Sequence, residues 1–213
     1  MSEVANLCNA IMHQLDKLGW ATSKNMLPGL PKQRIQELTA DLPFTLPASL
    51  IELYEWSEGV SPESEGGDEF MPGYGMDPLS EQIEAYWDLS ADDEYPRFHA
   101  LGQFWFPFLR SGGTDFYAAM CTASDAEDPV IVHDDNDGPH RSPPSRPGTA
   151  FVSLEAMLRT VLRAYEQGAY HVDNGRLIVG IHTYHENGRL KGVDWTQFKE
   201  IARAENPGVS RYL

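Results

Sequence analysis

The feature that most constrains the fold is an aromatic stretch near the middle of the chain, FHALGQFWFPFLR, followed by the turn sequence SGGTD and the apolar run FYAAMCTA. Gly112 and Gly113 can adopt positive φ at no steric cost, so they predict a tight turn between two antiparallel strands. We expect these strands near 104–109 and 116–123, and a third strand at VIVHD, residues 130–134. The centre of the chain therefore predicts an antiparallel sheet.

Helical patterns precede and follow these strands. Apolar residues that recur every three or four positions predict amphipathic helices over 3–18, 31–42, 45 or 47 to 58, 78–89, 153–165 and 194–204. Gly19 and Gly59 are expected to end helices, and Ser153 is expected to cap one. Asp194 and Gln197 have the spacing of a capping box at the start of the last helix. Trp87 is expected to face inward, and Cys8 to lie at the margin of the first apolar stripe.

The C-terminal part contains two similar strings, YHVDNGRL and YHENGRL, 14 residues apart. Asn-Gly between extended residues is a strong hairpin signal, so we expect strands near 169–173, 176–184 and 189–193. Residues 60–77 are expected to form a long loop. The order of helices, strands and hairpins predicts an α+β fold: a mostly antiparallel sheet of about five or six strands with helices packed against it, N-terminal helices and a C-terminal hairpin-helix extension.

Charge is unevenly distributed along the chain. The sequence holds 16 Lys and Arg against 32 Asp and Glu, for a net charge of −16. Residues 35–96 contain 16 of the acids and no Lys or Arg, so this window carries the whole net charge. A field of this sign repels phosphate backbones and attracts basic partners. The composition therefore argues against direct nucleic-acid binding, although a plain solvated surface would give the same pattern.

The motifs of common enzymes and cofactor sites are missing from the sequence. It contains no GxGxxG, GxxxxGK[ST], HExxH or GxSxG, so we expect no enzymatic activity and no cofactor. Cys8 and Cys121 are too few for a disulfide framework, and Cys121 is expected to be a small buried hydrophobe. Without an apolar run of membrane-spanning length or a signal-peptide pattern, we expect a cytoplasmic protein with no membrane association.

Two clusters are weak candidates for a metal site. The string HDDNDG offers Asp134, Asp135 and Asp137, but Glu is missing at the twelfth position that an EF-hand requires. His182 and His185 are three residues apart, with His171 on a neighbouring strand, yet residues three apart in a strand point to opposite faces. Solvated hairpin residues are the ordinary interpretation of both clusters. A metal-dependent enzyme is accordingly the remote alternative.

Four strings, in order, resemble the SUKH superfamily, the Smi/Knr-type domain. LPASLIELYEWSEG resembles its opening helix, and FWFPFLRSGGTDFYAAM resembles its aromatic strand with a Pro-apolar pair and a Gly-Asp-type turn. PVIVHDDNDG resembles the next strand and acidic turn, and FVSLEAMLRTVL the closing helix. The residues that carry these matches are Pro47, Leu50, Tyr54, Trp56, Gly59, Trp105, Pro107, Gly113, Asp115 and Ser153.

The resemblance covers about residues 40–165. It implies a single SUKH-like domain over 1–213, with N-terminal helices in 1–39 and hairpins and a helix in 166–213. The large aromatic residues are expected to be buried in the core. Pro107 within a strand predicts an edge position or a bulge, because proline donates no ladder hydrogen bond. An exposed edge there, or at the C-terminal hairpins, would allow a homodimer; otherwise the chain is a monomer.

The resemblance also implies a non-enzymatic binding role. Bacterial members of the superfamily are similar to immunity proteins that neutralise a cognate polymorphic toxin, often a nuclease or deaminase, and fungal members are similar to regulatory scaffolds that bind other cellular proteins. An acidic face could occupy the basic cleft of a nuclease. The expected contacts with such a basic toxin are acidic residues of two loops: Glu63, Glu65, Asp68, Glu69, Asp92, Asp93 and Glu94.

Overall fold

A six-stranded antiparallel sheet lies at the centre of the computed structural model, which describes residues 2–64, 68–91, 104–111, 115–121, 129–134, 148–184 and 190–209. The strands follow one another in sequence order across the sheet, each paired with its neighbour. They are β1 (Glu69–Met71), β2 (Tyr74–Gly75), β3 (Trp105–Arg110), β4 (Phe116–Met120), β5 (Ile131–Asp134) and β6 (Gly148–Phe151). The predicted α+β fold, with helices packed against a sheet of about five or six strands, is confirmed.

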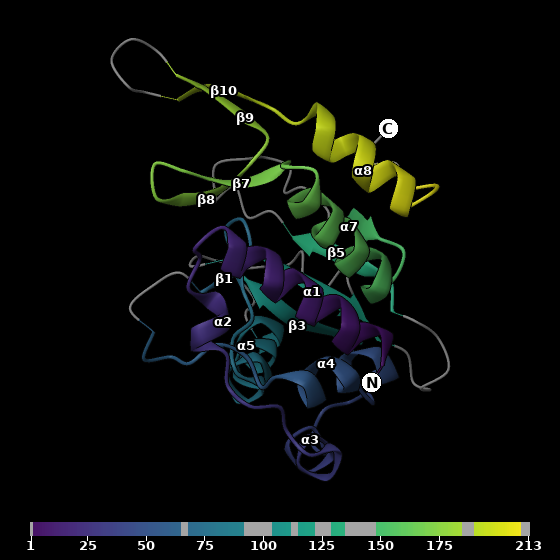
Figure 1. Ribbon diagram of the computed structural model, residues 1–213. Coiled ribbons are helices and arrows are strands. Elements are labelled where there is room, and N and C mark those ends of the chain that lie inside the picture. The colour runs from purple at the N-terminus through teal and green to yellow at the C-terminus, as the bar shows by residue number, and fades with distance from the viewer. Residues whose placement is uncertain are drawn as a thin grey trace.

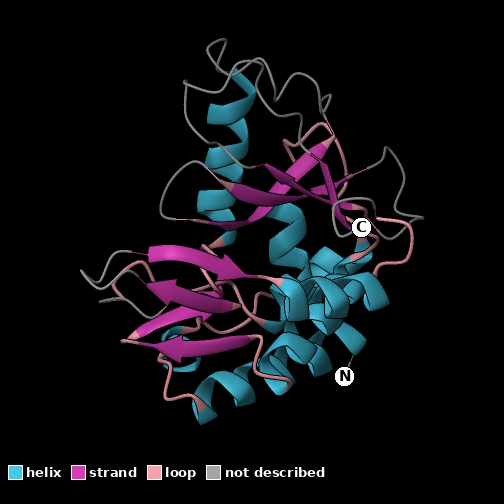
Figure 2. Cartoon of the chain, turned by 90° about the horizontal axis from the view of Figure 1, so that it is seen from above, coloured by secondary structure: helices cyan, strands magenta, loops and turns pink. Residues whose placement is uncertain are grey.

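The helices of the described residues are α1 (Glu3–Lys17), α2 (Thr22–Asn25), α3 (Lys32–Leu38), α4 (Ala48–Trp56), α5 (Leu79–Ala91), α7 (Leu154–Glu166) and α8 (Thr196–Glu205). Helices α1 and α7 lie side by side although they come from opposite ends of the sequence (Figure 1). Figure 2 shows α-helices gathered beside the sheet, and α5 contacts β3. Within the described part of the chain, no helix is long and apolar enough to cross a membrane.

The hydrophobic core lies between the sheet and these helices. Five consecutive residues of β3 are buried, so both faces of this strand are covered. Trp105 is fully buried, stacks on Phe116 with ring centroids 5.4 Å apart, and meets Tyr86 of α5 edge to face at 5.3 Å. Pro107 lies at a shift in the register with β4, which confirms the predicted bulge. Pro107 is itself buried, so the expected exposed edge beside it is wrong.

Several local predictions are confirmed by backbone geometry. Gly19 follows α1 with φ of 72°, and Ser153 caps α7, because its Oγ accepts a 3.1 Å hydrogen bond from Ala156 N–H. Asn174 and Gly175 both have positive φ in the turn between β7 (Tyr170–Asp173) and β8 (Arg176–Val179). These features depend on one to four neighbouring residues, which is why sequence patterns detect them.

Other local predictions are wrong. The expected loop 60–77 contains the hairpin of β1 and β2, and neither α2 nor β6 was expected. The helix expected to reach residue 42 ends at Leu38. Trp87 is 44% exposed rather than inward-facing, whereas Cys8 is fully buried rather than marginal. The buried residues of α1 are Val4, Cys8, Ile11, Met12 and Leu15, so the stripe that packs against α4 and α7 includes Cys8 and leaves the expected Leu18 exposed.

The strand expected over 176–184 is broken at Gly180. This residue has φ of 71°, and a Cβ there would clash with Asp194 O, so the chain can turn and pass close to the segment that carries Asp194 only with glycine. The result is two separate two-stranded sheets, β7 with β8, and β9 (Ile181–Tyr184) with β10 (Leu190–Asp194). The expected capping box is also wrong: Asp194 accepts from Thr196 N–H, and Gln197 Nε2 donates to Gln167 O.

Candidate functional site

An acidic pocket opens beside the β1–β2 hairpin. Its volume is about 630 Å³. Carboxylates and guanidinium groups from five parts of the chain line it, together with Trp20 and residues of the 60–64 segment. The charged lining residues are Asp68, Glu69, Asp77, Glu81, Arg110 and Arg176. We call these residues, with Trp20, the acidic pocket.

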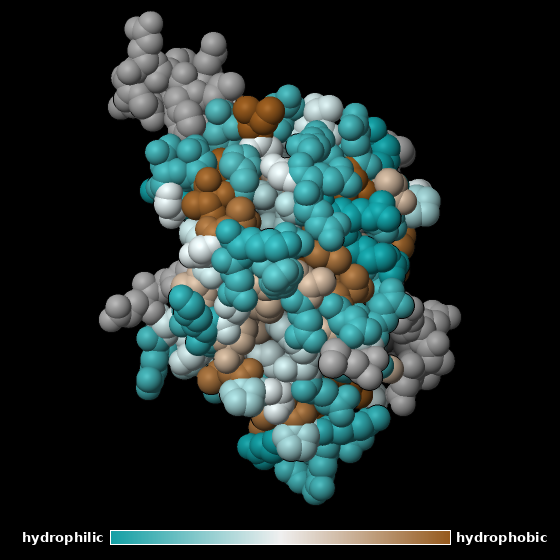
Figure 3. Space-filling model, in the orientation of Figure 1, coloured by the Kyte–Doolittle hydropathy of each residue, from teal (hydrophilic) through white to brown (hydrophobic). Residues whose placement is uncertain are grey.

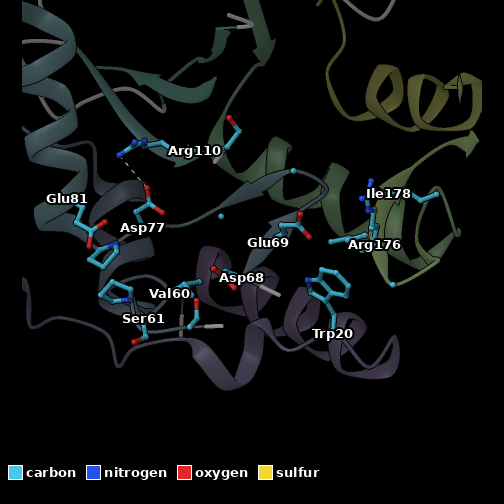
Figure 4. A pocket seen from close by; sticks show the side chains of 18 residues that line it. Trp20, Val60, Ser61, Asp68, Glu69, Asp77, Glu81, Arg110, Arg176 and Ile178 are labelled. Carbon is cyan, nitrogen blue, oxygen red and sulfur yellow. Dashed lines mark ion pairs between the residues drawn. The ribbon is translucent and has the colours of Figure 1, made fainter. Parts of the chain in front are cut away.

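The arrangement of the side chains in the pocket is visible in Figure 4. Arg110, Asp77 and Glu81 lie on one side, Trp20 and Arg176 on the other, and Asp68 and Glu69 between them. Four carboxylates therefore face two guanidinium groups within one cavity. Acidic groups therefore outnumber basic groups in the pocket, as they do in the whole chain.

Gly59 fixes the position of the segment that carries Asp77. Its φ is 130°, and a Cβ there would lie 2.6 Å from the backbone oxygens of both Met76 and Asp77. Val60 N–H donates a 2.7 Å hydrogen bond to Met76 O in the same crossing. The expectation that Gly59 ends a helix is wrong, because α4 stops at Trp56 and Ser57 is already extended. Gly59 instead lets two backbone segments approach closely at the wall of the pocket.

Asp77 is held between opposing charges. Arg110 Nη1 lies 3.5 Å from Asp77 Oδ2, and both side chains are about one-third exposed. Burial raises the pKa of Asp77, and the negative charges of Glu81 and Asp68 raise it further, while Arg110 lowers it. Burial and like-charge repulsion outweigh the single ion pair. A further cation in the pocket would relieve this repulsion.

Asp68 and Glu69 contain buried oxygens that lack a partner. Asp68 Oδ1 and Glu69 Oε2 are inaccessible to solvent and accept no hydrogen bond from the described residues, and Trp20 Nε1 in the same pocket donates none to them. Burial raises the pKa of Glu69 and the charge of Asp68 adds to the increase, whereas a hydrogen bond from the Gly73 backbone lowers it. Buried polar atoms without partners cost free energy. Groups that donate hydrogen bonds to these carboxylates would recover part of it.

The structure brings together only some of the predicted contact residues. Asp68 and Glu69 line the pocket, while Glu63 lies exposed on the neighbouring segment. Sequence reasoning missed Asp77, Glu81 and the two arginines, although both acids lie in the acidic window 35–96. The remaining predicted contacts, Glu65, Asp92, Asp93 and Glu94, lie outside the described residues.

A second cavity, of about 460 Å³, has a different chemistry. It lies between the sheet and the C-terminal elements, and most of its lining is aromatic or aliphatic. Its lining residues are Met71, Pro72, Tyr74, Tyr117, His133, Tyr170, Val179, Trp195, Phe198 and Lys199. We call it the aromatic cavity. In contrast to the acidic pocket, the described residues that line this cavity include no carboxylate.

The residues that carried the family resemblance have structural roles. Pro47 precedes α4, Leu50 and Tyr54 are buried on its inner face, and Trp56 Nε1 donates to Asn9 Oδ1 at 2.9 Å. Tyr54 packs against Phe106, with ring centroids 6.4 Å apart. Ser111 N–H donates to Asp115 O where β3 leads into β4; Gly113 lies outside the described residues. Those of the resemblance residues that the structure describes hold the sheet and helices together, and none of them lines the acidic pocket, although Gly59 positions one of its walls.

The metal hypotheses find no support in the described part of the chain. There, no group of three or more His, Cys, Asp or Glu side chains comes together. His171 lies in β7, His182 in β9, and Asp134 at the end of β5. Asp135, Asp137 and His185 lie outside the described residues, so clusters that include them stay predictions. Neither cysteine is poised for chemistry, since both are buried, and burial raises the pKa of Cys121 to about 12.

An antiparallel sheet covered by helices, with a charged pocket at one end, defines an acidic α+β domain. The model of the SMI1 / KNR4 family (SUKH-1) matches residues 29–145, which is more than half of the chain, and the chain belongs to this family. The match begins before the expected core and ends before α7. A search of curated proteins found no match to the chain.

Proposed function

We propose that this protein is a non-enzymatic immunity protein that neutralises a cognate toxin of the nuclease or deaminase type by direct contact. Membership of the SMI1 / KNR4 family supports a protein-binding role. The observation that carries the proposal is the acidic pocket, in which buried oxygens of Asp68 and Glu69 accept no hydrogen bond from the part of the chain that the structure describes. Lys and Arg side chains of a partner would bring positive charge beside these carboxylates and relieve the repulsion among them.

Charge favours a basic partner. The net charge of −16 attracts a positively charged surface and speeds its approach, whereas it repels nucleic acid. Figure 3 shows a face that is mostly hydrophilic, with hydrophobic side chains in separate patches. A contact that relies on charge suits such a surface better than one that needs a broad apolar area. We propose that the toxin binds across the acidic pocket and Glu63, and that the protein acts as a single domain in the cytoplasm.

Arginine is the partner side chain that fits the pocket best. Its guanidinium presents several N–H groups in a fixed plane and can donate to two carboxylates at once. Asp68 and Glu69 are adjacent in sequence, and both line the pocket. We propose that one Arg or Lys of the toxin enters the pocket and compensates the repulsion among Asp68, Asp77 and Glu81.

The test uses the double variant Asp68→Asn, Glu69→Gln. The wild-type protein is immobilised, lysate of its source is passed over it, and proteins that elute with salt are identified. Each is then expressed alone and together with the wild-type or variant protein in a host whose growth is followed. We expect a partner that arrests growth alone, is neutralised by the wild type, and is neutralised less by the variant.

A matched control removes the same charge elsewhere. The double variant Glu166→Gln, Glu200→Gln alters two exposed acids that lie outside the acidic pocket, and it should neutralise like the wild type. A captured partner whose expression leaves growth unchanged would contradict the immunity role. It would favour the second candidate, a regulatory scaffold for other cellular proteins.

A further inference from the structure

The aromatic cavity has two walls that come from different parts of the chain. One wall is built from the sheet, through Tyr74 of β2, Tyr117 of β4 and His133 of β5. The opposite wall comes from the C-terminal elements, through Tyr170 of β7 and Phe198 of α8. The sheet wall lies inside the region matched by the family, 29–145, and the opposite wall lies outside it. The cavity therefore exists only because the C-terminal elements fold back onto the family core.

Each wall is a cluster of rings held in a defined orientation. Tyr117 lies 4.8 Å from Tyr74 and 4.5 Å from His133, centroid to centroid, and Tyr74 Oη lies 2.6 Å from His133 Nε2. On the other wall, Tyr170 and Phe198 stack with centroids 5.3 Å apart. Rings locked by their neighbours lose little freedom when another ring packs against them. Such walls suit a flat aromatic ligand.

Lys199 places a positive charge at the rim of the cavity. Trp195 and Lys199 are the most exposed of its lining residues, and four positions separate them at the start of α8, so they lie on the same side of the helix. Within the described part of the chain, no carboxylate lies within ion-pair distance of Lys199. In a chain of net charge −16, a lysine beside an aromatic cavity favours a ligand that carries a negative charge of its own.

We propose that the aromatic cavity is a binding site for a small planar aromatic carboxylate. The ring of the ligand lies between the two walls and under Trp195, and its carboxylate pairs with Lys199 at the rim. A volume of about 460 Å³ falls within the usual range of small-molecule sites, about 300–1,000 Å³. One ammonium group matches one carboxylate, and the acidic chain disfavours ligands with several negative charges.

The proposed ligand site is independent of the proposed immunity function. Its lining residues and those of the acidic pocket are different sets, so a ligand in one cavity leaves the other open. Loss of toxin binding in the acidic-pocket variant would leave the ligand site unaffected. Likewise, failure of the ligand test would leave the acidic pocket as it stands.

Three related probes test the proposal: indole-3-acetate, neutral indole and cationic tryptamine. Binding to the full-length protein is measured by titration with amide chemical shifts as the readout, so that the binding site and the affinity are obtained together. We expect saturable millimolar binding of indole-3-acetate with shifts at Tyr117, Trp195 and Lys199. Indole should bind two- to fivefold more weakly, roughly the contribution of one exposed ion pair, and tryptamine more weakly still.

Two variants and one control complete the test. Lys199→Gln should remove the preference for indole-3-acetate over indole, while Lys24→Gln, an exposed lysine that does not line the cavity, should retain it. Trp195→Ala, at a residue that is 43% exposed, should weaken all three probes without unfolding the protein. Equal affinity for indole-3-acetate and tryptamine, shifts that map elsewhere, or no saturable binding at millimolar concentration would each overturn the proposal.

Discussion

The six-stranded sheet and the C-terminal hairpins differ in how far their strands are buried and paired. Strand β3 is buried along five of its six residues and is paired on both sides, with β2 and β4. Within the described ranges, each of the strands β7, β8, β9 and β10 pairs with one other, and Ile181 of β9 is 64% exposed. The comparison predicts that the sheet supplies most of the stability, while the C-terminal part adds a wall to a cavity and buries fewer side chains, among them Tyr170 and Phe198.

Two tryptophans give the largest test of this comparison. Trp105→Ala in β3 removes a fully buried ring that stacks on Phe116, and it should lower the free energy of unfolding by about 3–5 kcal/mol. Trp195→Ala beside α8 should cost well under about 1 kcal/mol, because its ring is already half exposed. Urea unfolding of both variants measures the difference. Similar losses would mean that the C-terminal part is as integral to stability as the sheet.

Two glycines give the next largest effect. Gly59→Ala forces a Cβ into a residue with φ of 130° and within 2.6 Å of two backbone oxygens, and it should cost at least about 1–3 kcal/mol. Gly148→Ala, where a Cβ would meet nothing within 4 Å, should change stability by less than about 0.5 kcal/mol. Thermal unfolding compares them. If Gly59→Ala is as mild as the control, the crossing at residues 76–77 does not shape the acidic pocket.

The starts of α7 and α8, which follow the family match in the sequence, should differ by a smaller amount. Ser153→Ala removes the Oγ that accepts from Ala156 N–H at the start of α7, and it should cost about 1 kcal/mol. Asp194→Ala removes an acceptor for Thr196 N–H before α8, and it should cost less because Asp194 is fully exposed to solvent. Chemical denaturation of both variants ranks them. The reverse order would show that α8 contributes more stability than its packing suggests.

The smallest predicted effect is a gain in stability rather than a loss. The pKa of Glu69 is raised above its ordinary value of 4.5, so the folded chain binds protons more readily than the unfolded chain. The free energy of unfolding therefore falls as the pH rises from 4.5 through the raised pKa of Glu69. Asp68→Asn removes one cause of the increase and should stabilise the protein at pH 7 by a fraction of about 1 kcal/mol. The gain should vanish at low pH, where Glu69 is protonated in both the folded and the unfolded chain.

The exposed residue Glu63 provides the control for this prediction. Glu63→Gln lies on the segment beside the pocket but outside its lining, and it should leave stability unchanged at every pH. Measuring unfolding as a function of pH separates the two variants. If Asp68→Asn destabilises the protein at pH 7, the carboxylates are not in repulsion. A stabilising substitution that also weakens partner binding would be typical of a functional site.

How well the sequence predicted the structure depended on whether the signal was local. Gly19, Ser153 and the Asn174–Gly175 turn depend on a few neighbours, and they were predicted correctly. The β1–β2 hairpin was missed because it joins the sheet through the pairing of Gly75 with Arg110, which is distant in sequence. The break at Gly180 depends on the close approach of Asp194 O, which no local pattern reveals.

The residues of the candidate site also divide into those that a local sequence signal indicates and those whose role depends on distant contacts. Asp68 and Glu69 were predicted from the acidic window alone, because the density of charge is visible in the sequence. Asp77 and Glu81 were missed because their role depends on the backbone crossing at Gly59 and on Arg110 from another strand. The aromatic cavity could not be predicted at all, because its two walls meet only through the packing of the C-terminal elements on the sheet.

The central claim is that the acidic pocket binds a basic protein partner. The most direct test measures the association rate of the captured partner with the wild type, with the Asp68→Asn, Glu69→Gln variant and with the Glu166→Gln, Glu200→Gln control over increasing salt. We expect the pocket variant to associate about tenfold more slowly at low salt and to depend less on salt, while the control stays close to the wild type. Equal rates and equal salt dependence for the pocket variant and the wild type would contradict the claim.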